Sequence, residues 1–220
     1  MKQIVRNYEI LQDIPNTPFT PIGDSGAAKD LIFHIRSHDV PTQVLDIGFG
    51  KGKLGQLIKN TPSTAHWQID GIDGYEHTCL NKALFDEKIY RNVWHGFAQD
   101  LSLDALRDYD VICLLDVIEH LDADTAKWLL RTLLMSLKDD AFLFISTPLW
   151  FYPQHEASTG DLEEHLIGIP ASAIMPLQPI MYAISNEFVG NFVFTKKALI
   201  SLSFSTPPTI KISLWKWGRK

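Results

Sequence analysis

Apolar and polar residues follow two periods along the chain, one typical of buried strands and one typical of helices. Short apolar runs predict strands at 43–47, 66–72, 88–96, 110–115 and 141–146. Apolar residues at helical spacing predict helices at 53–59, 75–85, 101–107 and 124–137, and an earlier one from Asp24 or Ser25 to about Ser37. Strands that alternate with helices in this way predict an α/β domain with a parallel, doubly wound sheet.

The alternation stops after the fifth predicted strand. Residues 147–179 contain five prolines and no long periodic run. Two β-rich segments follow at 181–188 and 191–195, and Val189-Gly190 between them predicts a hairpin turn. A final run at 209–215 alternates polar and apolar residues and predicts another strand. We therefore expect a mostly parallel sheet that ends in an antiparallel C-terminal hairpin.

Composition narrows the class of protein. The chain has 220 residues, of which 45% are hydrophobic, and this suits one folded domain over residues 1–220 with an N-terminal helical cap at 1–40. The net charge is −6, and the basic residues form no patch or stripe, so nucleic acid is not expected as a partner. The two cysteines form no C-x-x-C motif, and the sequence has neither a signal peptide nor an apolar stretch of roughly 20 residues. The expected location is the cytoplasm, with no membrane contact.

A glycine-rich loop follows the first predicted strand, in the string DIGFGKGKLG at 46–55. Read from Gly50, it is G-x-G-x-x-G, the dinucleotide fingerprint. Read from Asp46, it is D-x-G-x-G-x-G, which resembles the first motif of the S-adenosylmethionine (SAM) methyltransferases. In both cases glycines let the backbone turn tightly and approach the ligand. Asp46 favours the second interpretation, because an acid suits an ammonium and a sulfonium but not a pyrophosphate.

The resemblance continues downstream. The string YDVICLLDVIEHL at 109–121 resembles the "FDVI…DVLEHL" signature of the fourth strand in a large methyltransferase subfamily, and Ser146-Thr147-Pro148 resembles its "S-T/V-P". These motifs occur in order over residues 40–150, and the chain is thereby identified as a member of the class I SAM-dependent methyltransferase family. The resemblance implies a Rossmann-like sheet with an antiparallel last strand, SAM as cofactor and S-adenosylhomocysteine (SAH) as product.

The resemblance also implies which residues bind the cofactor. They are Asp46, Gly48, Phe49, Gly50, Gly52, Asp73, Gly74, Phe97, Ala98, Asp116 and Val117. Asp73 ends the second strand roughly 20 residues after the loop, where an acid accepts ribose hydroxyls, and Asp70 is the alternative.

One position departs from the family pattern. Methyltransferases of this type often have G-D-A after the third strand, where the acid binds the adenine amino group, but this chain has Gly96-Phe97-Ala98. Phe97 is expected to pack on the adenine while the Ala98 amide reaches a ring nitrogen. Asp100 is the alternative acid, and a third interpretation makes Phe97 an ordinary core residue.

Methyl transfer mainly requires that acceptor, methyl and sulfur lie in line, with a base only for a protonated acceptor. The candidate bases are His120, after the fourth strand, and His165, with His155 as a weaker third. His120 equally suits a hydrogen bond at a helix start. The loop at 147–180 resembles a "P-Q…G-D/N…H" pattern of some bacterial relatives, and its aromatic and histidine residues suit a planar or sugar-like acceptor.

The oxygen-rich group after the fourth strand is an alternative site for a metal ion, with Asp116, Glu119, His120, Asp122 and Asp124 as ligands. Because Asp122 and Asp124 also suit the first turn of a helix, no metal is expected.

These motifs predict transfer of a methyl group to a small-molecule or glycan-type acceptor. One alternative is an NAD-dependent oxidoreductase, which requires the hairpin at 181–195 to be wrong. The other is a SAM-binding protein without transfer activity, which the Phe97 departure leaves open. The sequence gives neither the attacking atom nor the oligomeric state.

Overall fold

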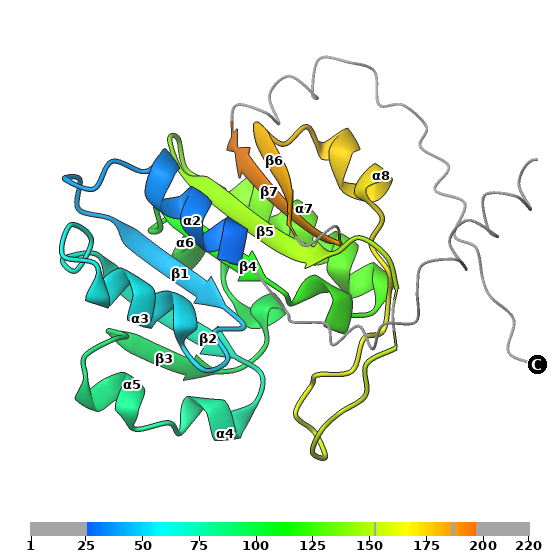
Figure 1. Cartoon of the computed structure of the whole chain (residues 1–220), viewed down its shortest axis with the longest axis horizontal. Coiled ribbons are helices and arrows are strands. Elements are labelled where there is room, and N and C mark those ends of the chain that lie inside the picture. The colour runs from blue at the N-terminus through cyan, green and yellow to red at the C-terminus, as the bar shows by residue number, and fades with distance from the viewer. Residues whose placement is uncertain (1–25, 152, 186–187, 197–220) are drawn as a thin grey trace, which may run out of the picture.

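A seven-stranded sheet forms the centre of the computed structural model, which describes residues 26–151, 153–185 and 188–196 (Figure 1). The strand order is β3-β2-β1-β4-β5-β7-β6. The strands are β1 (Gln43–Ile47), β2 (Gln68–Asp73), β3 (Asn92–His95), β4 (Val111–Leu115), β5 (Phe142–Pro148), β6 (Met181–Ser185) and β7 (Val189–Thr195). Strands β1 to β5 pair in parallel, and β7 runs antiparallel to both β5 and β6. The predicted sheet and its antiparallel hairpin are thereby confirmed.

Helices cover both faces of the sheet (Figure 1). One face carries α2 (Gly26–Ile35), α3 (Lys53–Asn60), α4 (Glu76–Cys79) and α5 (Ala83–Asp86). The other carries α6 (Leu103–Leu106), α7 (Ala123–Ser136) and α8 (Ala171–Ile174). Three short 3₁₀ turns complete the described elements: η1 (Ala98–Asp100), η2 (Ile118–His120) and η3 (Met175–Leu177).

The alternation of side chains along each strand produces two separate cores. On β4, Ile112 packs with Leu133 of α7, while the adjacent Cys113 belongs to the opposite core with Ile58 of α3. All five residues of β4 are buried, as expected of a central parallel strand with helices on both sides. Burial of one such leucine or isoleucine contributes roughly 1.5–3 kcal/mol, so β4 fixes the centre of the sheet.

The predicted position of the hairpin turn was wrong. Val189 and Gly190 lie within β7, and the turn comes earlier, where Phe188 N–H donates to Ser185 O at 3.1 Å. Gly190 serves close packing rather than a turn, since a Cβ there would lie 2.5 Å from Leu149 Cδ2. The local sequence alone cannot distinguish a glycine that forms a turn from one that allows close packing.

Several element boundaries also differ from the predictions. The helix expected at 75–85 is the pair α4 and α5, and the strand expected at 88–96 is only β3. The strand predicted at 209–215 and the first 25 residues of the predicted cap lie outside the described residues. None of the helices in the described ranges has the length and apolar character needed to cross a membrane.

Candidate active site

The glycine loop joins β1 to α3 at the carboxyl edge of the parallel strands, where ligands of such sheets bind. Gly48 and Gly50 have φ values of 69° and 52°, a region that residues with a Cβ enter only at a cost. No atom lies within 4 Å of the position that a Cβ of Gly50 would take. The loop therefore presents bare backbone to open space at Gly50, as the approach of a ligand requires.

Asp73 at the end of β2 holds the loop in place. One carboxylate oxygen accepts from Gly50 N–H at 2.9 Å and the other from Tyr75 N–H at 2.8 Å. The structure thus brings the predicted ribose acceptor into direct contact with the glycine loop. Gly74 follows it, and a Cβ there would lie 2.7 Å from Leu162 Cδ1 and 2.9 Å from Phe97 Cε1.

Asp70, the alternative to Asp73, has a different function in the fold. Its buried carboxylate pairs with Arg91, and Tyr109 Oη donates to it at 2.9 Å. Burial opposes ionisation, but these hydrogen bonds together with that of Asn92 hold the pKa of Asp70 below its usual value. Asp70 pairs within the sheet with Asn92 at the start of β3, so it fixes the amino ends of the strands rather than the ligand edge.

Two predicted cofactor residues of the loop point into the protein. Asp46 is buried and accepts from Tyr90 Oη at 2.7 Å. Burial raises the pKa of Asp46 to about 6, although the Tyr90 hydrogen bond acts in the opposite direction. Phe49 is also buried, with its ring centroid 5.2 Å from that of Tyr90. The Phe49 side chain therefore supports the loop, and only its backbone remains for a ligand.

The segment after β3 settles one of the open alternatives. Phe97 is 46% exposed, so it is not an ordinary core residue. Asp100 accepts from Phe97 N–H at 3.1 Å and so holds the turn that begins η1 at Ala98. The Phe97 ring lies beside Gly74, with Cε1 2.9 Å from the position that a Cβ of Gly74 would take.

The exit of β4 lies against the glycine loop. Val117 approaches Gly48 so closely that a Cβ at Gly48 would lie 2.4 Å from Val117 Cγ2. The chain turns sharply at Asp116, whose φ is 55°, and the Asp116 carboxylate accepts from Ser146 Oγ at 2.7 Å. The residues that follow β1 and β4 are thus in contact at the point where the strand order reverses.

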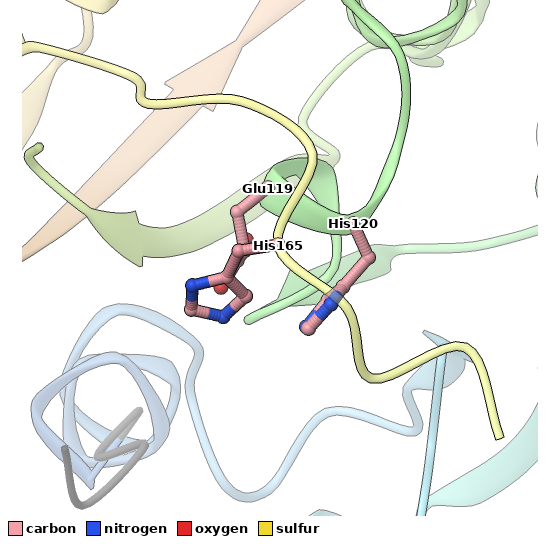
Figure 2. A group of neighbouring side chains, drawn as sticks. All are labelled: Glu119, His120 and His165. Atoms are coloured by element: carbon pink, nitrogen blue, oxygen red, sulfur yellow. The ribbon is translucent and has the colours of Figure 1, made fainter. Parts of the chain in front are cut away.

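Beyond Val117, three titratable side chains converge: Glu119, His120 and His165 (Figure 2). One potential ligand atom from each lies within 4.8 Å of those of the other two. The imidazole centroids of His120 and His165 are 4.8 Å apart. Glu119 and His120 belong to η2, whereas His165 comes from the long segment after β5, so the two predicted bases meet although 44 residues separate them.

Burial dominates the electrostatics of this cluster. It raises the pKa of Glu119 well above the usual value, with a further increase from the charge of Asp116. Burial lowers the pKa of His120, although the carbonyls of Glu164 and Glu163 act in the opposite direction. The His120 ring therefore favours its neutral form near pH 7.

The segment that carries His165 is held over this edge by specific hydrogen bonds. Glu119 O accepts from Leu166 N–H at 2.9 Å and from Ile167 N–H at 3.2 Å. His165 N–H donates to Gln154 O at 3.1 Å, and Gln154 Nε2 donates to Glu163 O at 2.8 Å. In Figure 1 the segment is the yellow-green loop between β5 and α8. These bonds keep the His165 side chain buried beside η2.

His155, the weaker candidate base, is exposed on the same segment and does not belong to the cluster. No local motif singles out Glu119, which the sequence indicates only as one acid of a possible metal group. Its burial follows from the position of η2 under the segment after β5, which no local pattern reveals. Two cavities, of about 340 and 440 Å³, lie at the amino ends of the parallel strands, away from the glycine loop. The candidate site is therefore identified by the geometry of the loop and not by a cavity.

Comparisons with known proteins agree with this geometry. A family model described as "Methyltransferase domain" matches residues 24–189. No curated protein matches the chain.

Solved structures share the fold at low sequence identity. A SAM-dependent methyltransferase from Clostridium acetobutylicum is 11% identical, with a TM-score of 0.59 over 86% of this chain and 98% of that one. The 1,6-didemethyltoxoflavin-N1-methyltransferase of Burkholderia thailandensis, solved with bound 1,6-didemethyltoxoflavin and SAH, is 15% identical, with a TM-score of 0.58 over 87% of this chain and 84% of that one. The N-terminal domain of EvdMO1, solved in the presence of SAH and D-fucose, is 12% identical, with a TM-score of 0.54 over 77% and 82%.

The family model covers most of the chain, including the glycine loop, Asp73 and the β4 exit. The predicted family and fold are therefore confirmed. The chain belongs to the methyltransferase domain family and has the fold of the class I SAM-dependent methyltransferases.

Proposed function

We propose that this protein transfers the methyl group of SAM to a small-molecule or glycan-type acceptor held beneath the segment at 147–180. The contact between Gly48 and Val117 is the observation that supports this most directly. It joins the loop assigned to the methyl donor to the strand exit that carries His120. Donor and base would then lie at the ends of adjacent strands, where an acceptor between them can be aligned with the methyl group and the sulfur.

The cofactor residues divide by the part of SAM that each would contact. Asp73 would accept the ribose hydroxyls, and Phe97 would stack on the adenine with the Ala98 amide beside it. Gly48 and Gly50 would present backbone to the methionine end, near Asp116. Asp46 would act through the loop, because its carboxylate is buried against Tyr90.

In the transfer, the acceptor atom attacks the methyl carbon while the carbon–sulfur bond breaks, and its electron pair returns to sulfur. The sulfonium already activates the carbon, so the protein mainly aligns the partners and excludes water. An alcohol acceptor also has to lose its proton. A half-buried, neutral His120, or His165 beside it, suits this step as general base.

The acceptor class is suggested by two observations. The segment after β5 carries Trp150 and Phe151, each about half exposed, which offer faces to a ring. The Burkholderia enzyme was solved with bound 1,6-didemethyltoxoflavin, and the EvdMO1 domain in the presence of D-fucose. A planar or sugar-like acceptor is the one we propose for this chain, in the predicted cytoplasmic location.

A screen for SAH formation tests the proposal. Purified protein and SAM are incubated with two panels, one of deoxysugars and glycosides and one of hydroxylated or N-heterocyclic aromatics. We expect acceptor-dependent SAH release from members of one panel, and mass spectrometry of a product heavier by one methylene group. Binding of SAH without turnover in either panel would favour the non-catalytic alternative. The oxidoreductase alternative required the β6–β7 hairpin to be absent, and the hairpin is present.

A further inference from the structure

The geometry points to a binding site for one divalent transition-metal ion, formed by Glu119, His120 and His165. The site itself is independent of methyl transfer, but its consequence for the acceptor rests on the proposed function. The residues come from η2 and from the segment after β5, so the site exists only when these two segments pack together.

The distances suit a metal after a small adjustment of the side chains. The ligand atoms lie within 4.8 Å of one another (Figure 2). Metal–nitrogen and metal–oxygen bonds of about 2.0–2.2 Å in a tetrahedron separate the ligands by roughly 3.3–3.6 Å. Rotation of two imidazole rings and one carboxylate can close a difference of this size without a change in the backbone.

The donor set selects the kind of metal. Two imidazoles and one carboxylate favour zinc, iron, cobalt or manganese, whereas magnesium and calcium prefer oxygen ligands alone. Three protein ligands also leave at least one coordination position open, as in zinc sites that act on a substrate.

The surrounding hydrogen bonds orient two of the ligands. His120 Nδ1 lies 3.1 Å from Glu164 O. Because a carbonyl oxygen only accepts, Nδ1 carries the hydrogen, and Nε2 of the neutral ring keeps its lone pair for a metal. Thr147 Oγ1 donates to Glu119 Oε2 at 3.1 Å, which leaves Oε1 to point at the ion. This pattern of a backbone carbonyl and a hydroxyl behind the ligands is typical of metal sites.

Charge adds a further argument. Glu119 is 2% exposed, and a carboxylate is costly to bury without a partner of opposite charge. A divalent cation beside Glu119 would supply that partner.

The site would also change the chemistry of transfer. An acceptor hydroxyl at the open position would lose its proton to solvent more readily, and its oxygen would then attack the methyl carbon. His120 and His165 would in that case act through the ion rather than as bases themselves.

Binding of Co²⁺ alone provides the test, with full-length, tag-free protein stripped by a chelator. Equilibrium dialysis and the visible absorption of bound Co²⁺ are measured for wild type, Glu119→Gln, His165→Asn and His155→Ala. His155→Ala is the matched control, because this histidine belongs to the same segment but not to the cluster. We expect wild type to bind one Co²⁺ per chain with micromolar or tighter affinity. Glu119→Gln and His165→Asn should bind Co²⁺ at least 100-fold more weakly, whereas His155→Ala should keep the affinity of wild type.

Folding is checked by circular dichroism and thermal melting, and if Glu119→Gln does not fold, His165→Asn decides. Absence of stoichiometric binding by wild type, or unchanged affinity in folded His165→Asn, would overturn the site. The readout uses neither SAM nor an acceptor. A protein that binds Co²⁺ but releases no SAH therefore contradicts only the proposed function, and the reverse result contradicts only the metal site.

Discussion

The two sides of the candidate site are built in different ways. On the cofactor side, backbone groups dominate: Gly50 N–H and Tyr75 N–H both donate to Asp73, and Gly48 lies directly against Val117. On the acceptor side, side chains dominate: Glu119, His120 and His165 converge in a largely buried cluster. The difference indicates that the cofactor side depends on backbone conformation, whereas the acceptor side depends on the chemistry of individual groups. Variants on the two sides should therefore separate binding from turnover.

The largest effect is expected on the acceptor side. His165→Ala should lower kcat by about 10²–10⁴-fold, because acceptor deprotonation depends on this ring directly or through a bound ion. The affinity for SAH should stay within about two-fold, since the ring of His165 lies against His120 of η2 on the acceptor side. Steady-state kinetics with the acceptor found by the screen, together with calorimetry for SAH, measures both quantities. Full activity in the variant would remove His165 from the mechanism.

Gly50→Val should weaken SAH binding by at least about 100-fold in a folded protein. Its side chain would enter the open space beside the loop, and the positive φ adds about 1–2 kcal/mol of backbone strain. Gly160→Val is the matched control, because Gly160 also has a positive φ, of 77°, and open space around its Cβ position. The control shares the strain but should keep SAH affinity. Equal losses in both variants would show that strain alone explains the result.

Asp73→Asn and Asp70→Asn should separate ligand affinity from stability on the same strand. Asp73→Asn should weaken SAH binding about 10–100-fold, since the ribose and the loop amide both lose a carboxylate acceptor. Asp70→Asn should instead lower the free energy of unfolding by about 2 kcal/mol or more, because it breaks the buried contacts with Arg91 and Tyr109. Urea titration and calorimetry on both variants measure this. Unchanged SAH affinity in Asp73→Asn would remove the ribose assignment.

The smallest effect concerns pH and Asp46. Its pKa is about 6 in the fold and 3.8 otherwise, so the folded state binds the proton more tightly and ionisation costs roughly 3 kcal/mol at pH 7. The contribution of Asp46 to stability therefore falls as pH rises from about 4 to beyond 6, by about 1–1.5 kcal/mol between pH 5 and 7.5. Asp46→Asn keeps an acceptor for Tyr90 but cannot ionise. Its stability relative to wild type, from urea titration, should rise by that amount over the same interval, and a constant difference would contradict the pKa.

The same contrast explains what the sequence could predict. The apolar run of β4 and the glycines at 48–52 determine local structure by themselves, so the sequence predicted the sheet and the loop. It did not predict the hydrogen bond between Gly50 and Asp73. The partner of Asp46 could not be predicted either, because Tyr90 lies 44 residues away and reaches it only across the folded core. The burial of Glu119 could not be predicted for the same reason, since it depends on a segment near residue 165.

Glycine illustrates a second limit of the sequence. At Gly48 the sequence correctly predicted a bend, whereas at Gly190 it predicted a turn where the structure has a packed strand. Both glycines lie close to a neighbouring side chain, Val117 or Leu149, but only Gly48 has a positive φ, of 69°.

The most direct test of the central claim is calorimetric titration of the purified protein with SAH and, in parallel, with NAD. Residues 46–55 are assigned to a SAM-type ligand, so we predict stoichiometric, micromolar binding of SAH and no heat from NAD. Binding of NAD without SAH would contradict the assignment of the loop and of every cofactor residue that depends on it.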